Sequence, residues 1–161
     1  MTPPDSSPDT YLREAIELAR AGMQDGRGGP FGALVVKDGR IIGRGTNQVV
    51  RSADPTAHAE IVAIRQACAA LGSHVLSGCE VYATCEPCPM CLAASYWARV
   101  DRVSYACTSD DARDAGFDDA LICQELAQPS RARRLPMRQA LRGEALALFD
   151  EWKANPSWAR Y

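Results

Sequence analysis

Apolar residues recur along this chain with two different spacings, which predict alternating helices and strands. Between residues 9 and 23 they lie three or four positions apart, opposite a charged face, as in an amphipathic helix. Short apolar runs at 31–36 and 40–47 flank Asp38 and Gly39, a pair typical of hairpin turns because glycine tolerates positive φ. The chain is therefore expected to begin with a helix followed by a β-hairpin.

The rest of the chain continues this alternation. Asp54 and Pro55 predict a helix start, because aspartate caps helices and proline fits their first turn, and this helix should run to about residue 71. Further strands are expected at 79–84, 102–107 and 135–141, and further helices at 87–97, 118–126 and 144–153. Pro136 would place the last strand at an edge or at a strand start. The pattern predicts an α/β fold in which helices cover a mixed sheet.

Length and composition favour one soluble globular domain. The chain has 161 residues, of which 47% are hydrophobic and 24% charged. No apolar run approaches the roughly 20 residues that span a bilayer, and the first residues lack the basic start and apolar stretch of a secretory signal. We expect residues 1–8 to form a flexible N-terminus. A net charge of −2 does not favour a nucleic-acid partner, and we interpret the basic cluster at 131–134 as a solvated loop.

The seven cysteines indicate a reducing compartment, because their number is odd and no secretory signal is recognised. We therefore expect a cytoplasmic protein. Three of them crowd between positions 85 and 91, which suggests a metal site, whereas the other four are interpreted as small buried hydrophobic residues.

Cys88 and Cys91 lie three positions apart in a segment expected to open a helix, so their side chains should project from nearly the same face. Pro89 fits the first turn, and the positive helix end favours thiolates. His58 would supply a third ligand from the preceding helix. Three nitrogen and sulfur ligands leave the fourth tetrahedral position open, which is the catalytic arrangement for zinc.

Glu60 is the candidate proton-transfer residue. Residues two apart on a helix diverge by roughly 200°, so His58 and Glu60 can converge only if the metal lies off the N-terminal end of their helix. There Glu60 would take a proton from a water molecule and pass protons to the substrate ring and the leaving amine. A closed structural site with Cys85 as fourth ligand is the main alternative, and another divalent metal also remains open.

At these residues the sequence resembles the cytidine-deaminase-like superfamily, and most closely its guanine deaminase branch. The segments that carry the resemblance are GGPFGA at 28–33, DPTAHAE at 54–60, CEPCPMC at 85–91, YWAR at 96–99 and AGFDD at 115–119. The resemblance implies a three-layer α/β/α fold with a five-stranded mixed sheet. It also implies a homodimer, in some members with exchanged C-terminal segments, for which residues of about 143–161 are the candidates here. The implied reaction is zinc-dependent hydrolysis of guanine to xanthine and ammonia.

The resemblance also assigns roles to individual residues. It implies that His58, Cys88 and Cys91 bind zinc, that Glu60 is the proton shuttle, and that Asp119 is a second acidic residue near the substrate. The implied substrate-binding positions are Phe31, Asn47, Ala59, Trp97 and Tyr161. Three other functions stay open: a deaminase of another small ring, such as cytosine, a guanosine-type nucleoside or an amino-triazine; a tRNA adenosine deaminase; and a zinc-stabilised module without catalysis.

Overall fold

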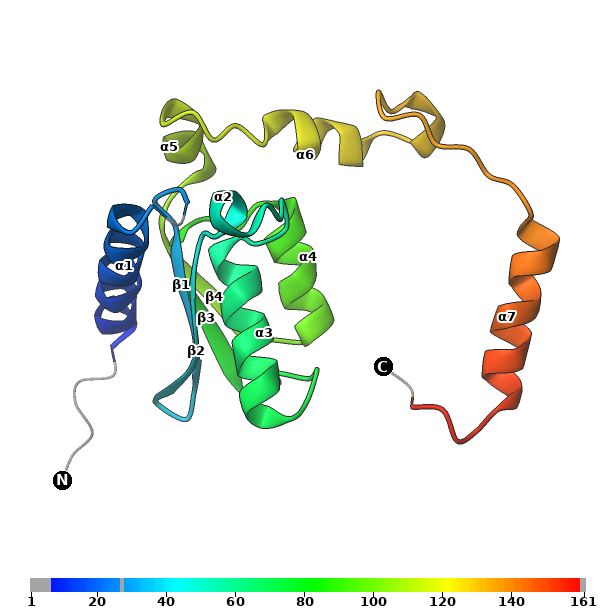
Figure 1. The fold of residues 1–161 in the computed structure, drawn as a ribbon, viewed down its shortest axis with the longest axis horizontal. Coiled ribbons are helices and arrows are strands. Elements are labelled where there is room, and N and C mark those ends of the chain that lie inside the picture. Colours follow the sequence, from blue (N-terminus) through cyan, green and yellow to red (C-terminus); the bar gives the residue numbers. More distant parts are fainter. Residues whose placement is uncertain (1–6, 27, 160–161) are drawn as a thin grey trace. The chain divides into compact units, whose positions relative to one another are not determined.

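The computed structural model describes residues 7–26 and 28–159, which form two compact units divided after Ile122. The first unit holds a four-stranded sheet and most of the helices (Figure 1). Its elements are α1 (Pro8–Gln24), β1 (Gly32–Lys37), β2 (Arg40–Thr46), α2 (Val49–Ser52), α3 (Ala59–Leu71), β3 (Cys79–Cys85), α4 (Pro89–Ala98), β4 (Arg102–Cys107) and α5 (Ser109–Asp114). Helix α6 (Ala120–Ala127) spans the boundary, and η1 (Ser130–Ala132) and α7 (Arg142–Ala154) belong to the second unit.

The sheet has the strand order β2-β1-β3-β4 and is mixed, as predicted. Strand β1 runs antiparallel to both β2 and β3, whereas β3 and β4 are parallel and are connected through α4. The β1–β2 turn contains Asp38 and Gly39, both with positive φ (49° and 72°). Two consecutive positive φ angles match the right-handed twist of a tight hairpin, which explains the aspartate–glycine pair at this turn.

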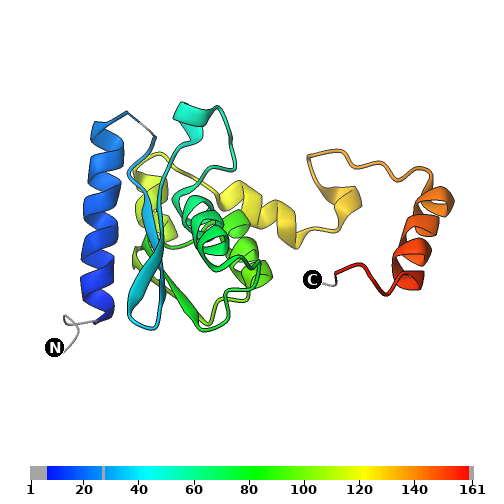
Figure 2. The same cartoon turned by 60° about the horizontal axis from the view of Figure 1, so that its bottom comes forward.

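Helices cover both faces of the sheet, which confirms the three-layer expectation (Figures 1 and 2). On one face, Tyr11 and Ala15 of α1 pack against Leu34, Val36 and Tyr82. On the other face, α3 and α4 pack on the alternate side chains of β1 and β3. The core residues of this second face include Ala33, Val35, Ala63, Ala67, Val81 and Ala83. Alternation along the strands therefore divides the core into two halves.

Helix α3 lies unusually close to β2 because two glycines face it. A Cβ atom added at Gly43 would come within 2.3 Å of the Ala63 carbonyl oxygen, and one added at Gly45 within 2.0 Å of the Ala59 carbonyl oxygen. Ala59 is the first residue of α3 and is completely buried. The two glycines thus set how closely the N-terminal end of α3 approaches the sheet.

Two predictions of secondary structure were wrong, one helix start and one strand. The helix expected from Asp54 begins only at Ala59, because the Asp54 side chain instead accepts hydrogen bonds from the backbone and hydroxyl of Thr56 and closes a local turn. Residues 135–141 form no strand among the described residues, so the sheet has four strands rather than five. Pro136 lacks the amide hydrogen that a strand partner would need, and Leu141 turns the chain with a φ of 55°.

The second unit has little core of its own. None of its helical residues is buried, and large apolar side chains such as Leu148 and Phe149 are more than 60% exposed. Arg133 donates to the carbonyl oxygens of Glu125 and Gln128, so part of the predicted basic loop folds back on α6. The expectation that both units form one deaminase domain stays a prediction. Among the described residues, no helix combines the length and apolar character needed to cross a membrane.

Candidate metal and substrate site

Two helix N-termini bring three metal-binding side chains together. His58 is the N-cap of α3 and Cys88 the N-cap of α4, while Cys91 lies in the first turn of α4. The His58 Nδ1 atom lies 3.5 Å from the Cys88 Sγ atom and 3.6 Å from the Cys91 Sγ atom. The ligand atoms of all three residues lie within 4.8 Å of one another, close enough to bind one ion. The sequence reasoning had named these three residues.

The charges of the group suit a thiophilic cation. Hydrogen bonds from Cys91 and then from His58 lower the pKa of the Cys88 thiol to about 4. Donating to Cys88 raises the pKa of the Cys91 thiol, and the hydrogen bond with Cys88 raises the pKa of His58. One thiolate is thus already stabilised at the tip of α4. One imidazole nitrogen and two sulfur atoms are a ligand set that zinc prefers.

The structure does not bring Cys85 into this ligand group. Its thiol instead donates to the carbonyl oxygen of Thr108 at 3.4 Å, beyond the end of β4. Three protein ligands rather than four leave a position for water or substrate, so the arrangement favours a catalytic site over a closed structural one.

Glu60 lies beside the ligand group in the first turn of α3 and is only 8% exposed. Burial raises the pKa of its carboxyl group, and the negative charge of Cys88 adds to that rise. A raised pKa favours the protonated form of a carboxyl group, and a carboxyl group beside a metal site can act as a general acid and base. His58 is the N-cap of α3 and Glu60 lies in its first turn, so both lie at the N-terminal end of the helix. This is the place where the sequence predicts the metal.

A cavity of about 450 Å³ opens onto these residues. Its wall includes Phe31, Asn47, His58, Glu60, Cys88 and Asp119, all named from the sequence. Ala59 is buried between His58 and Glu60 and does not line the cavity. Trp97 lies near the end of α4 with 74% of its surface exposed and is likewise absent from the wall. Tyr161 lies outside the described residues.

The amide of Asn47 has a defined orientation. Its Oδ1 atom accepts hydrogen bonds from the backbone N–H groups of Gly29 (3.4 Å) and Val49 (3.2 Å). Its own backbone N–H donates to the carbonyl oxygen of Phe31 at 3.0 Å. Because the amide oxygen is already occupied, the amide NH₂ group is the part available to a ligand, and Asn47 can act there as a hydrogen-bond donor.

Phe117 is the main cavity residue that the sequence reasoning missed. Its ring meets that of Phe31 edge to face, with centroids 4.9 Å apart and planes at 84°. The two rings form an apolar wall for a flat ligand. Within the segment AGFDD, the sequence resemblance assigns a role only to the second aspartate, Asp119. Asp118 caps α6 by accepting from the Ala120 N–H at 2.9 Å, whereas the Asp119 carboxylate makes no hydrogen bond within the described part of the chain.

Comparison with known proteins agrees with this geometry. A sequence profile of the family described as "Cytidine and deoxycytidylate deaminase zinc-binding region" matches residues 5–107. The chain belongs to this family. It is 50% identical to guanine deaminase from Bacillus subtilis over 145 residues, covering 90% of this chain and 93% of that protein. The crystal structure of guanine deaminase from Bacillus subtilis matches with a TM-score of 0.92 and 48% identity, over 95% of this chain and 98% of that one.

A second group of relatives within the same family shares less of the chain. The tRNA-specific adenosine deaminase from Aquifex aeolicus is 42% identical over 96 residues, which cover 60% of this chain and 63% of that protein. The similarity to the guanine deaminase thus extends over a larger part of both chains.

Proposed function

We propose that this protein is a zinc-dependent hydrolase that converts guanine and water into xanthine and ammonia. The observation that carries the proposal is the site itself, in which three zinc-preferring ligands lie together and two of them, His58 and Cys88, share one cavity with the buried carboxyl group of Glu60. Similarity to a guanine deaminase over nine-tenths of the chain selects guanine among the rings that this chemistry can serve. The cavity volume lies within the usual range for small-molecule sites.

His58, Cys88 and Cys91 would hold the metal. Zinc held by these residues would lower the pKa of a bound water molecule and so would supply hydroxide near neutral pH. Glu60 takes the proton that this water gives up and delivers it to the ring nitrogen next to the carbon bearing the 2-amino group. The carbon–oxygen bond forms and the carbon–nitrogen bond breaks. As the carbonyl forms, Glu60 takes the remaining proton from the new hydroxyl group and passes it to the departing amine, which leaves as ammonia.

The cavity wall would orient the ring for this attack. The Asn47 amide donates a hydrogen bond to an acceptor atom of the base, and Phe31 contacts its face. Asp119, whose carboxylate is free within the described residues, would serve as a second proton relay on the cavity wall. Trp97 and Tyr161 are proposed to complete the pocket in the assembled enzyme, together with the backbone at Ala59.

We propose that the assembled enzyme is a homodimer, with the C-terminal segment exchanged between copies. The exposed apolar side chains of the second unit and of α4 support this, because a stable soluble protein covers surfaces of this kind. Sedimentation velocity would show a single species of twice the chain mass. A cytoplasmic location is part of the same proposal, supported by cysteines that are all free.

Ammonia release from purified, zinc-loaded protein tests the function. The panel contains guanine, guanosine, cytosine, cytidine, adenine, adenosine and an amino-triazine, and only guanine should react. Glu60→Gln should keep zinc and fold yet lose about 100-fold or more in turnover. The matched control is Glu17→Gln on the exposed side of α1, which should behave like wild type. Release from another ring, or an active Glu60→Gln variant, would contradict the proposal.

A further inference from the structure

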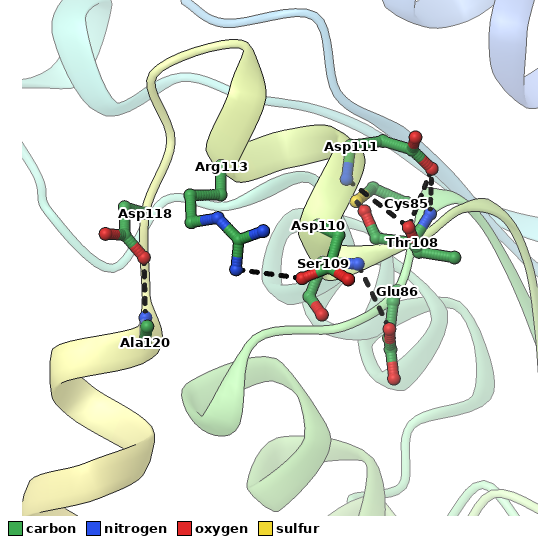
Figure 3. Close-up of polar contacts among 9 residues, drawn as sticks. All are labelled: Cys85, Glu86, Thr108, Ser109, Asp110, Asp111, Arg113, Asp118 and Ala120. Atoms are coloured by element: carbon green, nitrogen blue, oxygen red, sulfur yellow. Dashed lines mark hydrogen bonds and ion pairs between the residues drawn. The ribbon is translucent and has the colours of Figure 1, made fainter.

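The side chain of Glu86 links the segment that carries Phe117 and Asp119 to residues 86–88, the metal-binding loop between β3 and α4. The Glu86 Oε2 atom accepts a hydrogen bond from the Ser109 N–H at 3.1 Å, at the start of α5 (Figure 3). The Glu86 backbone N–H donates to the carbonyl oxygen of Cys107 at 2.8 Å. Glu86 lies two residues before the ligand Cys88, so it bridges the metal-binding loop and α5.

Helix α5 is internally well defined. Thr108 and Asp111 form a reciprocal capping box at its N-terminal end. At its C-terminal end, the N–H groups of Gly116 and Phe117 donate to the carbonyl oxygens of Arg113 and Ala112, with Gly116 at a φ of 93°. This pair of hydrogen bonds is a Schellman motif, which fixes the direction in which the chain leaves the helix. The position of α5 therefore determines where Phe117 and the two following aspartates lie.

Packing alone holds α5 weakly in place, because none of its residues is buried. The contacts that attach its two ends to the site are few. In the described part of the chain they include the Glu86–Ser109 hydrogen bond, the hydrogen bond from the Cys85 thiol to the Thr108 carbonyl oxygen, and the Phe31–Phe117 ring contact. The Glu86 hydrogen bond is the one in which the acceptor carries a full charge, and such bonds are stronger than neutral ones.

We infer that Glu86 is a positioning residue that fixes the cavity wall formed by Phe117 and Asp119 relative to the metal ligands. The carboxylate acts through the Ser109 N–H, and no proton transfer is assigned to it. Its contribution is to keep the apolar wall and the second carboxylate at the distance from the metal that a bound ring requires. The substrate named in this inference is that of the proposed function. The attachment of α5 to the metal-binding loop does not depend on that function.

Three variants test the inference. Glu86→Ala removes the acceptor, Glu86→Gln keeps a neutral oxygen acceptor, and Asp110→Ala is the matched control. Asp110 lies on the same short helix, and its exposed carboxylate forms an ion pair with Arg113 at 2.9 Å (Figure 3). Each variant is loaded with zinc, and its zinc content and thermal unfolding midpoint are measured alongside kcat and KM for guanine.

Glu86→Ala should raise KM about tenfold, with zinc content unchanged, and Glu86→Gln should restore most of the loss. Amide hydrogen exchange of residues 108–119 should be about tenfold faster in Glu86→Ala than in wild type, while exchange in β3 is unchanged. Asp110→Ala should match wild type in both measurements. Unchanged exchange and KM in Glu86→Ala, loss of zinc instead, or no rescue by glutamine would each overturn the inference.

The exchange measurement does not depend on the substrate. If wild-type protein releases no ammonia from guanine, the proposed function fails, while faster exchange in Glu86→Ala still supports the attachment. If wild type deaminates guanine and Glu86→Ala is indistinguishable from it, the proposed function stands and the inference is wrong.

Discussion

Replacing Gly45 by alanine should disturb the site from the far side of α3. The new Cβ atom would lie 2.0 Å from the Ala59 carbonyl oxygen and 2.7 Å from the Ala63 nitrogen, both backbone atoms. Real Cβ atoms essentially never come closer than 3.0 Å, so α3 and β2 must separate by at least 3.0 − 2.0 = 1.0 Å. Ala59 lies between the ligand His58 and Glu60, the proposed proton-transfer residue. The displacement therefore occurs where the site is most sensitive.

The magnitudes follow from this displacement. Overpacking of this kind costs about 1–3 kcal/mol, which for a chain of this length lowers the unfolding midpoint by about 2–12 °C. A displacement near 1 Å within a catalytic group lowers turnover by about 100-fold. Zinc affinity should fall as well, because the backbone that orients His58 has moved.

Differential scanning calorimetry, zinc titration and the guanine assay measure the three effects on one preparation. Gly143→Ala is the matched control, because its Cβ atom would meet nothing within 4 Å in α7. This control should keep the zinc affinity and the turnover of wild type, and its midpoint should be equal to or slightly above that of wild type, because alanine favours a helix more than glycine does. A Gly45→Ala protein with the same midpoint, zinc content and turnover as wild type would refute the reasoning about close packing at α3.

Three further outcomes are expected. Cys91→Ala should lose stoichiometric zinc, measured by atomic absorption, because its sulfur is one of three ligand atoms within 4.8 Å; retained zinc would exclude it as a ligand. Asn47→Asp keeps the oxygen that accepts from Gly29 and Val49 but lacks the amide donor, so KM for guanine should rise about tenfold at an unchanged unfolding midpoint. Burial, and then the hydrogen bond to Glu80, raise the pKa of Tyr82 to about 12, above its usual value of about 10. The stability that this shift contributes is complete below a pH of about 10 and is lost as the pH rises towards 12. Tyr82→Phe should therefore remove the last tyrosinate step in an alkaline absorbance titration. It should also flatten the decline of the free energy of unfolding over this pH range.

Much of the fold could be predicted because its signals are local. The amphipathic spacing of α1, the Asp38–Gly39 turn and the apolar runs of β1, β3 and β4 depend on neighbouring residues only. The helix start at Asp54 was misplaced because two signals compete there. The same aspartate side chain that can cap a helix also closes a turn with Thr56, and the turn prevails in the folded chain.

The sequence by itself determined the chemistry of the site. The motif consists of a histidine, a glutamate two residues after it, and two cysteines three positions apart. It limits which metal can bind and which residue can transfer protons, because few ligand sets bind zinc with an open position. Only the tertiary structure decided how the site is enclosed. Ser109 meets Glu86 of the metal loop, and Phe117 meets Phe31, in each case across more than 20 residues of sequence, and no periodicity predicts such contacts. They depend on where β3 and β4 end in the sheet, which is set by packing across the whole unit.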